Sequence, residues 1–142
     1  MQDLKISKII NTDRGSYVAL QNQYEEYKLI FIDSFESTML TFQITGYGDL
    51  AHIRTVYQIF SSFMESAGYI VKEVEIEKYN EGVGNAKVSL LKNKTPIYFN
   101  CSISDGMIIS HINNVNLRCS DNIWNELEEP DEEVNSEFNQ EF

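Results

Sequence analysis

The chain has 142 residues, of which 42% are hydrophobic, and it includes 8 Tyr, 8 Phe and 1 Trp, which is enough for one domain around one core. It contains no apolar run of about 18 residues, so we expect no membrane span. Its net charge of −11 repels phosphate backbones, so the charge does not favour binding to nucleic acid.

The N-terminal part predicts three strands followed by a helix. Residues 4–10 and 17–20 are apolar-rich and are separated by turn-forming residues, which predicts a hairpin. Residues 27–32 end in a continuous apolar run, which indicates a strand buried on both faces. Asp33 and Glu36 have the spacing of a capping box, so we expect a short helix to begin there.

A second helix is the clearest in the chain. We expect the first helix to end near residues 46–48, Asp49 to cap the second and Gly68 to end it. Its apolar residues recur at helical spacing, which predicts a single stripe packed on the core. The members of this stripe are Ile53, Val56, Tyr57, Phe60, Phe63, Met64 and Ala67.

Three further strands are predicted within residues 69–78, 86–90 and 97–101, because apolar and polar residues alternate there. In the first of these, Val74 and Ile76 alternate with glutamates, and Lys87 lies in its neighbour. One face of the meander that these three strands form is therefore exposed to solvent, and its charges suit cross-strand pairing.

The end of the chain predicts two more helices around a short strand. Ser102 and Asp105 have capping-box spacing for a helix of about residues 103–112. A strand at 115–117 follows, and Ser120 can cap a last helix. The order β-β-β-α-α-β-β-β-α-β-α predicts a single α+β domain, with a mixed or antiparallel sheet of about six strands and three to four helices.

Charge divides the chain into two parts. Residues 126–142 contain eight acidic residues and no Lys or Arg, so −8 of the net charge lies there and −3 remains for residues 1–125. We therefore expect a folded domain over residues 1–127 and an acidic, disordered tail over residues 128–142.

Cys101 and Cys119 are far apart and form no CxxC motif. The first residues lack the apolar segment of a signal peptide, so we expect reduced thiols and a cytoplasmic protein.

Searches for nucleotide-binding and hydrolase motifs with defined glycine spacing find none. His52 and His111 are isolated, which argues against a metal-ligand motif. A nucleophilic pair of either cysteine with His111 stays open, although Cys101 shares the apolar side of its strand.

Five stretches, taken in order, resemble the bifunctional nuclease domain family over about residues 3–127. The family has a strand ending Leu-Pro-Ile-Trp-Ile-Gly before a helix that begins with Glu, two strands of the types Val-x-x-Val-x-Ile and Tyr-Ala-x-Leu-x-Leu, a signature Asp-x-Arg-Pro-Ser-Asp-Ala-Ile, and an ending Pro-Ile-x-Val-Ser. The similar stretches here are Lys28–Ser37, Val71–Ile76, Asn85–Leu90, Asn100–Met107 and Asn116–Asp121.

Two polar motifs of that family are altered here. Its Arg-Pro-x-Thr-His-Asp corresponds to residues 52–58, which lack the His-Asp pair. In the motif Asp-x-Arg-Pro-Ser-Asp-Ala-Ile, the first Asp is replaced by Asn100 and the Arg-Pro by Ser102-Ile103. Ser104 and Asp105 are retained.

The resemblance implies a nuclease that hydrolyses DNA or RNA with a divalent metal ion such as Mg²⁺ or Mn²⁺. Asp105 would then be a metal ligand or base, with Glu36 as the second carboxylate and metal ligand and Ser104 beside them. Arg54 or His52 would contact phosphate. An alternative for both acids is purely structural, because each also occupies a capping position.

The altered motifs favour a second interpretation, a catalytically degenerate member that acts as an oligomeric binding or regulatory domain. Exposed strand edges and a high aromatic content favour self-association, most simply as a twofold dimer. Neither interpretation identifies a substrate or a metal.

Overall fold

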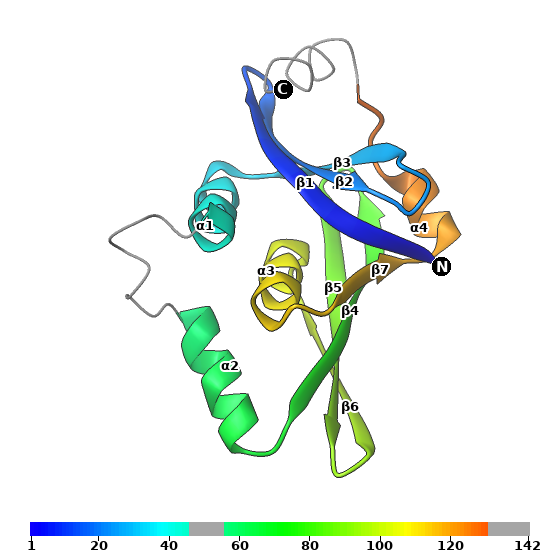
Figure 1. Cartoon of the computed structure of the whole chain (residues 1–142). Helices are drawn as coiled ribbons and strands as arrows, with labels where there is room; N and C mark the ends of the chain where they lie inside the picture. Colours follow the sequence, from blue (N-terminus) through cyan, green and yellow to red (C-terminus); the bar gives the residue numbers. More distant parts are fainter. Residues whose placement is uncertain (46–55, 131–142) are drawn as a thin grey trace.

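The computed structural model describes residues 1–45 and 56–130, and its elements follow one another in the predicted order (Figure 1). The strands are β1 (Gln2–Thr12), β2 (Gly15–Gln21), β3 (Tyr27–Ile32), β4 (Ile70–Asn80), β5 (Val83–Lys92), β6 (Thr95–Cys101) and β7 (Asn116–Cys119). The helices are α1 (Ser34–Thr45), α2 (Val56–Ser66), α3 (Ile103–Asn113) and α4 (Asp121–Glu126). The predicted α+β class is confirmed.

The seven strands form one mixed sheet in the order β3-β2-β1-β7-β4-β5-β6. All neighbours are antiparallel except β4 and β7, which are parallel. The prediction of about six strands was therefore one too low. The short β7 is a full member of the sheet because it pairs with β1 on one side and with β4 on the other, and thus joins the N-terminal hairpin to the meander.

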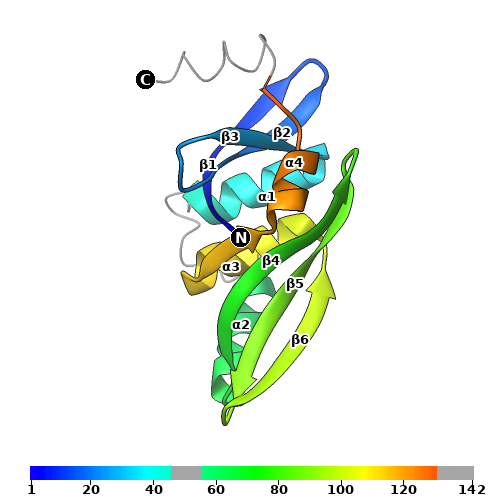
Figure 2. The same ribbon diagram turned by 90° about the vertical axis from the view of Figure 1, so that its right-hand side faces the viewer.

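Helices α2 and α3 lie behind the meander of β4, β5 and β6 in Figure 2, and α1 packs against β2 and α3. The opposite face of the meander carries the predicted charges. Lys87 pairs with Glu77 at 4.0 Å, and Arg118 of β7 reaches Glu73 of β4 at 3.5 Å and Asp3 of β1 at 2.9 Å. This face is therefore wet and cross-linked by ion pairs, as the alternation of residues predicted.

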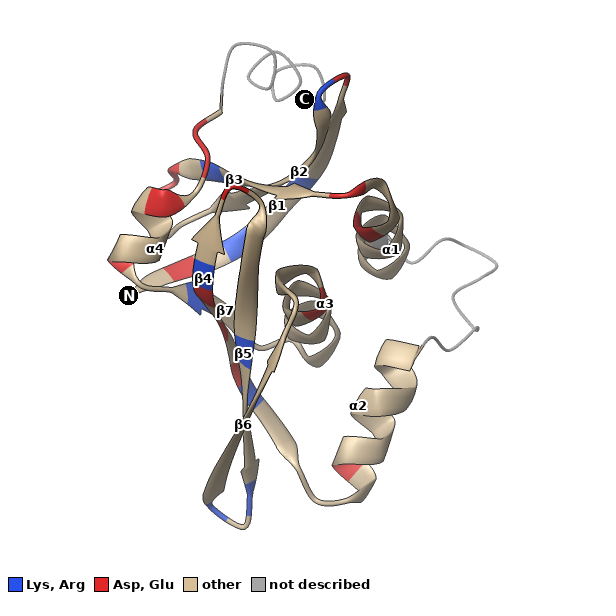
Figure 3. Cartoon of the chain, turned by 180° about the vertical axis from the view of Figure 1, so that it is seen from behind, with Lys and Arg blue, Asp and Glu red and all other residues tan. Residues whose placement is uncertain are grey.

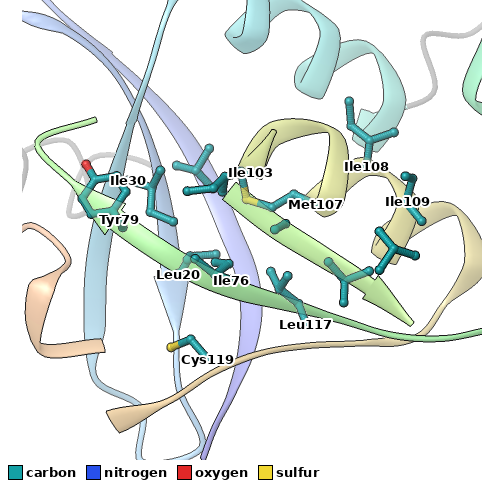
Figure 4. Close-up of a cluster of buried hydrophobic side chains, with 14 of the residues drawn as sticks. Leu20, Ile30, Ile76, Tyr79, Ile103, Met107, Ile108, Ile109, Leu117 and Cys119 are labelled. Carbon is teal, nitrogen blue, oxygen red and sulfur yellow. The ribbon is translucent and has the colours of Figure 1, made fainter. Parts of the chain in front are cut away.

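The core forms between the sheet and α3 (Figure 4). Met107 and Ile108 of α3 are 0% and 1% exposed, and they pack in the same cluster as Ile76 of β4 and Leu20 of β2. Helix α3 is covered by α1, by α2 and by the sheet, so it is apolar on most of its surface instead of on one stripe.

The predicted apolar stripe of the second helix is only partly correct. Tyr57 and Met64 pack against the core and Phe60 stacks edge-on against Phe99, but Val56 and Phe63 are 69% and 70% exposed. The reason is that α2 packs mainly on one neighbour, α3, which can cover only one side of a helix. Residues 46–49 and Ile53 lie outside the described residues. Gly68 follows the helix with φ +87, as predicted for a helix end.

Contacts with β3 continue beyond Leu127. Leu29 of β3 and Glu128 exchange backbone hydrogen bonds of 2.7 and 3.0 Å, and Lys28 forms an ion pair with Glu129. The Tyr79 hydroxyl donates to Glu128 at 2.8 Å and accepts from the Phe31 amide at 3.1 Å. Residues 131–142 lie outside the described residues, so the acidic tail stays a prediction.

Among the helices of the described ranges, none has both the length and the apolar character needed to cross a membrane. Both cysteines are free thiols, with Cys119 fully buried and Cys101 half-buried.

Candidate functional site

Two of the predicted site residues, Ser104 and Asp105, lie in the first turn of α3, and a third, Glu36, contacts Ser104. Strand β6 is followed by Ser102, which has extended backbone angles and accepts a hydrogen bond from the Asp105 amide at 3.1 Å. This is the cap that the spacing predicted. Gly106 then lets the first turn of α3 lie directly on the sheet, because an added Cβ would be 2.6 Å from the Cβ of Ala86.

The N-terminus of α1 brings the first carboxylate to this place. Asp33 and Glu36 form a reciprocal capping box, in which the Glu36 amide donates to Asp33 at 2.7 Å and the Asp33 amide donates to Glu36 Oε1 at 3.2 Å. The second oxygen, Oε2, accepts a hydrogen bond from the Ser104 hydroxyl. Both oxygens of Glu36 therefore hold structure together, one within α1 and one between α1 and α3.

Helix α2 supplies a third side chain. The Tyr57 hydroxyl donates a hydrogen bond of 2.6 Å to Asp105 Oδ1. Burial, together with this bond and the negative charge of Asp105, raises the pKa of Tyr57 above its ordinary value. The phenol therefore stays protonated at neutral pH and remains a donor that orients the carboxylate.

A small pocket of about 210 Å³ opens beside this junction. Glu36, Ser102 and Ser104 line it, together with residues 82–84 at the β4–β5 turn and the start of β5. Phe31 of β3 contributes to the wall, and its ring lies within 3.2 Å of the position that a Cβ on Gly82 would take. Space for a small group therefore adjoins the Glu36–Ser104 pair.

Of the five predicted site residues, Glu36 of α1 and Ser104 of α3 are joined by a hydrogen bond, and Asp105 follows Ser104 with its carboxylate bonded to Tyr57. His52 and Arg54 lie outside the described residues, so their placement stays a prediction. Sequence reasoning missed Tyr57, which it assigned to the apolar stripe of its helix. The available signal was its position, since Tyr57 belongs to the segment that corresponds to a polar motif of the family.

Carboxylate oxygens are the ligands that Mg²⁺ and Mn²⁺ prefer. Within residues 1–45 and 56–130, no group of three or more His, Cys, Asp or Glu side chains could hold a metal ion. Mg²⁺ commonly binds through one or two carboxylates, with water and substrate phosphate as the other ligands. Asp105 and Glu36 would therefore fit only a site that water and substrate phosphate complete, and two carboxylates do not fit a closed structural site.

The alternative of a cysteine–histidine pair receives no support. Cys101 precedes the first turn of α3 and His111 lies in its last turn, so about 15 Å of helix separates them. Burial raises the pKa of the Cys101 thiol to about 11 and that of Cys119 to about 12. Neither thiol is therefore ionised at neutral pH, as a cysteine nucleophile must be.

Comparison with known proteins identifies one family. The sequence model of the family described as "Bifunctional nuclease domain" matches residues 18–132, a range that extends from β2 to beyond α4 and includes all five predicted site residues. A search of curated proteins finds no match.

Proposed function

Because the chain belongs to the bifunctional nuclease domain family, we propose that it hydrolyses phosphodiester bonds of DNA or RNA with a divalent metal ion such as Mg²⁺ or Mn²⁺. The observation that supports the proposal is the junction of α1 and α3, where Glu36 accepts a hydrogen bond from Ser104 and the next residue, Asp105, accepts one from Tyr57. A metal ion bound there would neutralise phosphate charge and activate a water molecule.

Asp105 is the principal ligand or base in this proposal. Its amide is already paired with the Ser102 cap, and Tyr57 orients its carboxylate through Oδ1. Among the described residues, no hydrogen bond reaches Oδ2, which leaves this oxygen for a metal ion or a water molecule. Glu36 is the second carboxylate, through the oxygen that accepts from Ser104.

Arg54 and His52 are the proposed phosphate contacts. Support comes from the sequence, because Arg54 precedes Tyr57 by three residues and Tyr57 reaches Asp105. A cation close to the scissile phosphate stabilises the charge that develops in the transition state.

The test is cleavage of single-stranded DNA and RNA in the presence of Mg²⁺ or Mn²⁺ by the full chain and by Asp105→Asn. We expect Asp105→Asn to lower the rate by about 100-fold or more, as for the loss of a general acid–base group. Asp121→Asn is the matched control, because Asp121 also lies in the first turn of a serine-capped helix but far away on α4. Equal rates for Asp105→Asn and the wild type would disprove this site.

A second candidate function is a catalytically degenerate domain that binds a partner. It is favoured by the composition of the helices around the junction, since α1, α2 and α3 contain no Lys or Arg (Figure 3). A nuclease needs cations to hold phosphate, and the described helices offer none. Absence of cleavage by the wild-type chain with either metal would support this candidate over the first.

A further inference from the structure

We infer that a cavity between the ends of α2 and α3 and the start of β4 binds a small amphipathic amine, which is an ammonium group on a compact apolar body. The inference goes beyond the proposed function, because it concerns a second site and needs no nuclease activity. Three observations carry it: the size and mixed lining of the cavity, the unused hydrogen-bond acceptors in that lining, and the sign of its charge.

The cavity has a volume of about 420 Å³, which is within the range of about 300–1,000 Å³ for small-molecule sites. Its polar lining includes Ser61 and Glu65 of α2, whose spacing of four residues places them on one side of the helix. Asn113, the last residue of α3, also lines it. Its apolar lining includes Val71 of β4 and Ile112 of α3.

This cavity is separate from the candidate nuclease site. Asp105 lies in the first turn of α3 and Asn113 ends the same helix, so about 12 Å of helix lies between them. Asn113 Nδ2 donates a hydrogen bond of 3.2 Å to Ser61 Oγ and thus joins the two helices beside the cavity. Since no residue of α2 is buried, a ligand here would add contacts that hold this helix to α3 and β4.

The lining offers acceptors that the protein itself does not use. Among the described residues, the Glu65 carboxylate has no hydrogen-bond or ion-pair partner. Asn113 Nδ2 also donates to the Ile109 carbonyl at 2.9 Å, which identifies Oδ1 as the acceptor of this amide, and no donor in the described part of the chain reaches it. An ammonium group has three donors and no acceptor, so it matches these two side chains.

Charge excludes anions from this cavity. None of its described lining residues is Lys, Arg or His, and Glu65 is the charged residue among them. The C-terminus of α3, where Asn113 lies, is the negative end of the helix dipole and also favours a cation. A nucleotide, a phosphate or a carboxylate would therefore be repelled, and a neutral ligand would leave Glu65 unused.

An aromatic wall suits the apolar part of such a ligand. Tyr69, in the turn between α2 and β4, lines the cavity beside Val71. Lys92 Nζ lies 4.8 Å from the centroid of the Tyr69 ring and holds that ring by a cation–π contact, without itself lining the cavity. A flat apolar body can therefore pack against Tyr69 while its ammonium group faces Glu65 and Asn113.

Titration of the full chain with tyramine at pH 7, followed by ¹H–¹⁵N NMR, tests the inference. We expect a Kd on the order of 1 mM or tighter, with shifted amide signals at Ser61, Tyr69 and Asn113. Tyrosol, which has a neutral hydroxyl in place of the ammonium group, should bind about 5-fold more weakly. Adenosine monophosphate should not shift these signals. Tyramine shifts that are absent or lie elsewhere, equal affinity for tyrosol, or binding of the nucleotide here would each overturn the inference.

A charge-neutral variant provides a second test. Glu65→Gln should weaken tyramine about 5-fold and leave tyrosol unchanged, which shows that the cavity stays intact. Glu126→Gln is the matched control, because Glu126 is also exposed near the end of a helix but lies on α4; it should keep the wild-type affinity. Wild-type affinity for tyramine in Glu65→Gln would contradict the assignment. Neither test uses cleavage, so failure of the proposed nuclease activity would leave both results unaffected.

Discussion

The N-termini of α1 and α3 follow the same local rule and use their acids differently. At α1, Asp33 and Glu36 cap each other, and the remaining oxygen of Glu36 accepts from Ser104. At α3, Ser102 caps the Asp105 amide, but the Asp105 carboxylate turns away from the cap and accepts from Tyr57 instead.

These hydrogen bonds distinguish two carboxylates for which the sequence predicted the same role. Glu36 is occupied by structure on both oxygens, whereas Asp105 holds one contact with a neutral donor and is half-buried. Of the two, Asp105 is therefore the better candidate for chemistry, and Glu36 is the better candidate for stability.

The largest expected effect comes from a substitution that would push the N-terminus of α3 away from the sheet. Gly106 allows α3 to rest on the sheet, since an added Cβ would be 2.6 Å from Ala86 Cβ and 3.1 Å from Val74 Cγ1. We expect Gly106→Val to lower the free energy of unfolding by about 3 kcal/mol through overpacking. Urea denaturation measures the change, and Asn125→Val on the exposed face of α4 is the control, with an effect within about 0.5 kcal/mol. Equal stability of the two variants would contradict close packing at Gly106.

Alanine at each acid tests the comparison directly. Glu36→Ala removes half of the capping box and leaves the buried Ser104 hydroxyl without its acceptor, so we expect a loss of about 2 kcal/mol. Asp105→Ala removes a partly exposed contact and should cost about 1 kcal/mol or less. Thermal or urea unfolding of both variants gives the ranking. If Asp105→Ala costs as much as Glu36→Ala, the division of roles between the two acids is wrong.

Short-range features of this junction could be predicted from the sequence, because caps depend on residues three apart. The box of Asp33 and Glu36 and the cap at Ser102 both follow from that spacing. The order of elements also followed from local periodicity and turn residues.

Contacts between distant residues could not be predicted in the same way. Ser104 and Glu36 are 68 residues apart, and Tyr57 and Asp105 are 48 apart, so both bonds depend on how three helices pack. Tyr57 has a ring that packs like an apolar residue and a hydroxyl that needs a partner, and helical periodicity registers only the ring. Periodicity likewise cannot tell how many neighbours cover a helix, which is why Val56 and Phe63 were expected inside.

The smallest expected effect is a change in stability at alkaline pH, and it isolates the Tyr57–Asp105 contact. In the folded protein, burial raises the pKa of the Tyr57 phenol above its ordinary value of 10.0, and the hydrogen bond to Asp105 raises it further. The unfolded chain therefore releases this proton at a lower pH than the folded chain does. The contribution of Tyr57 is fully present below pH 10 and is lost as the pH rises above it, by up to about 1.4 kcal/mol per pH unit.

Tyr57→Phe should therefore flatten the fall in unfolding free energy between about pH 10 and 11, as measured by urea denaturation at a series of pH values. Some slope will remain, because burial also raises the pKa of Tyr79 to about 12 and that of Cys101 to about 11. Asp105→Asn should give an intermediate slope, since it removes the charge but leaves the burial, which is the larger cause. If unfolding free energy falls with pH as steeply in Tyr57→Phe as in the wild type, the contact with Asp105 does not keep the phenol protonated. The contrast between the N-termini of α1 and α3 would then have no support at α3.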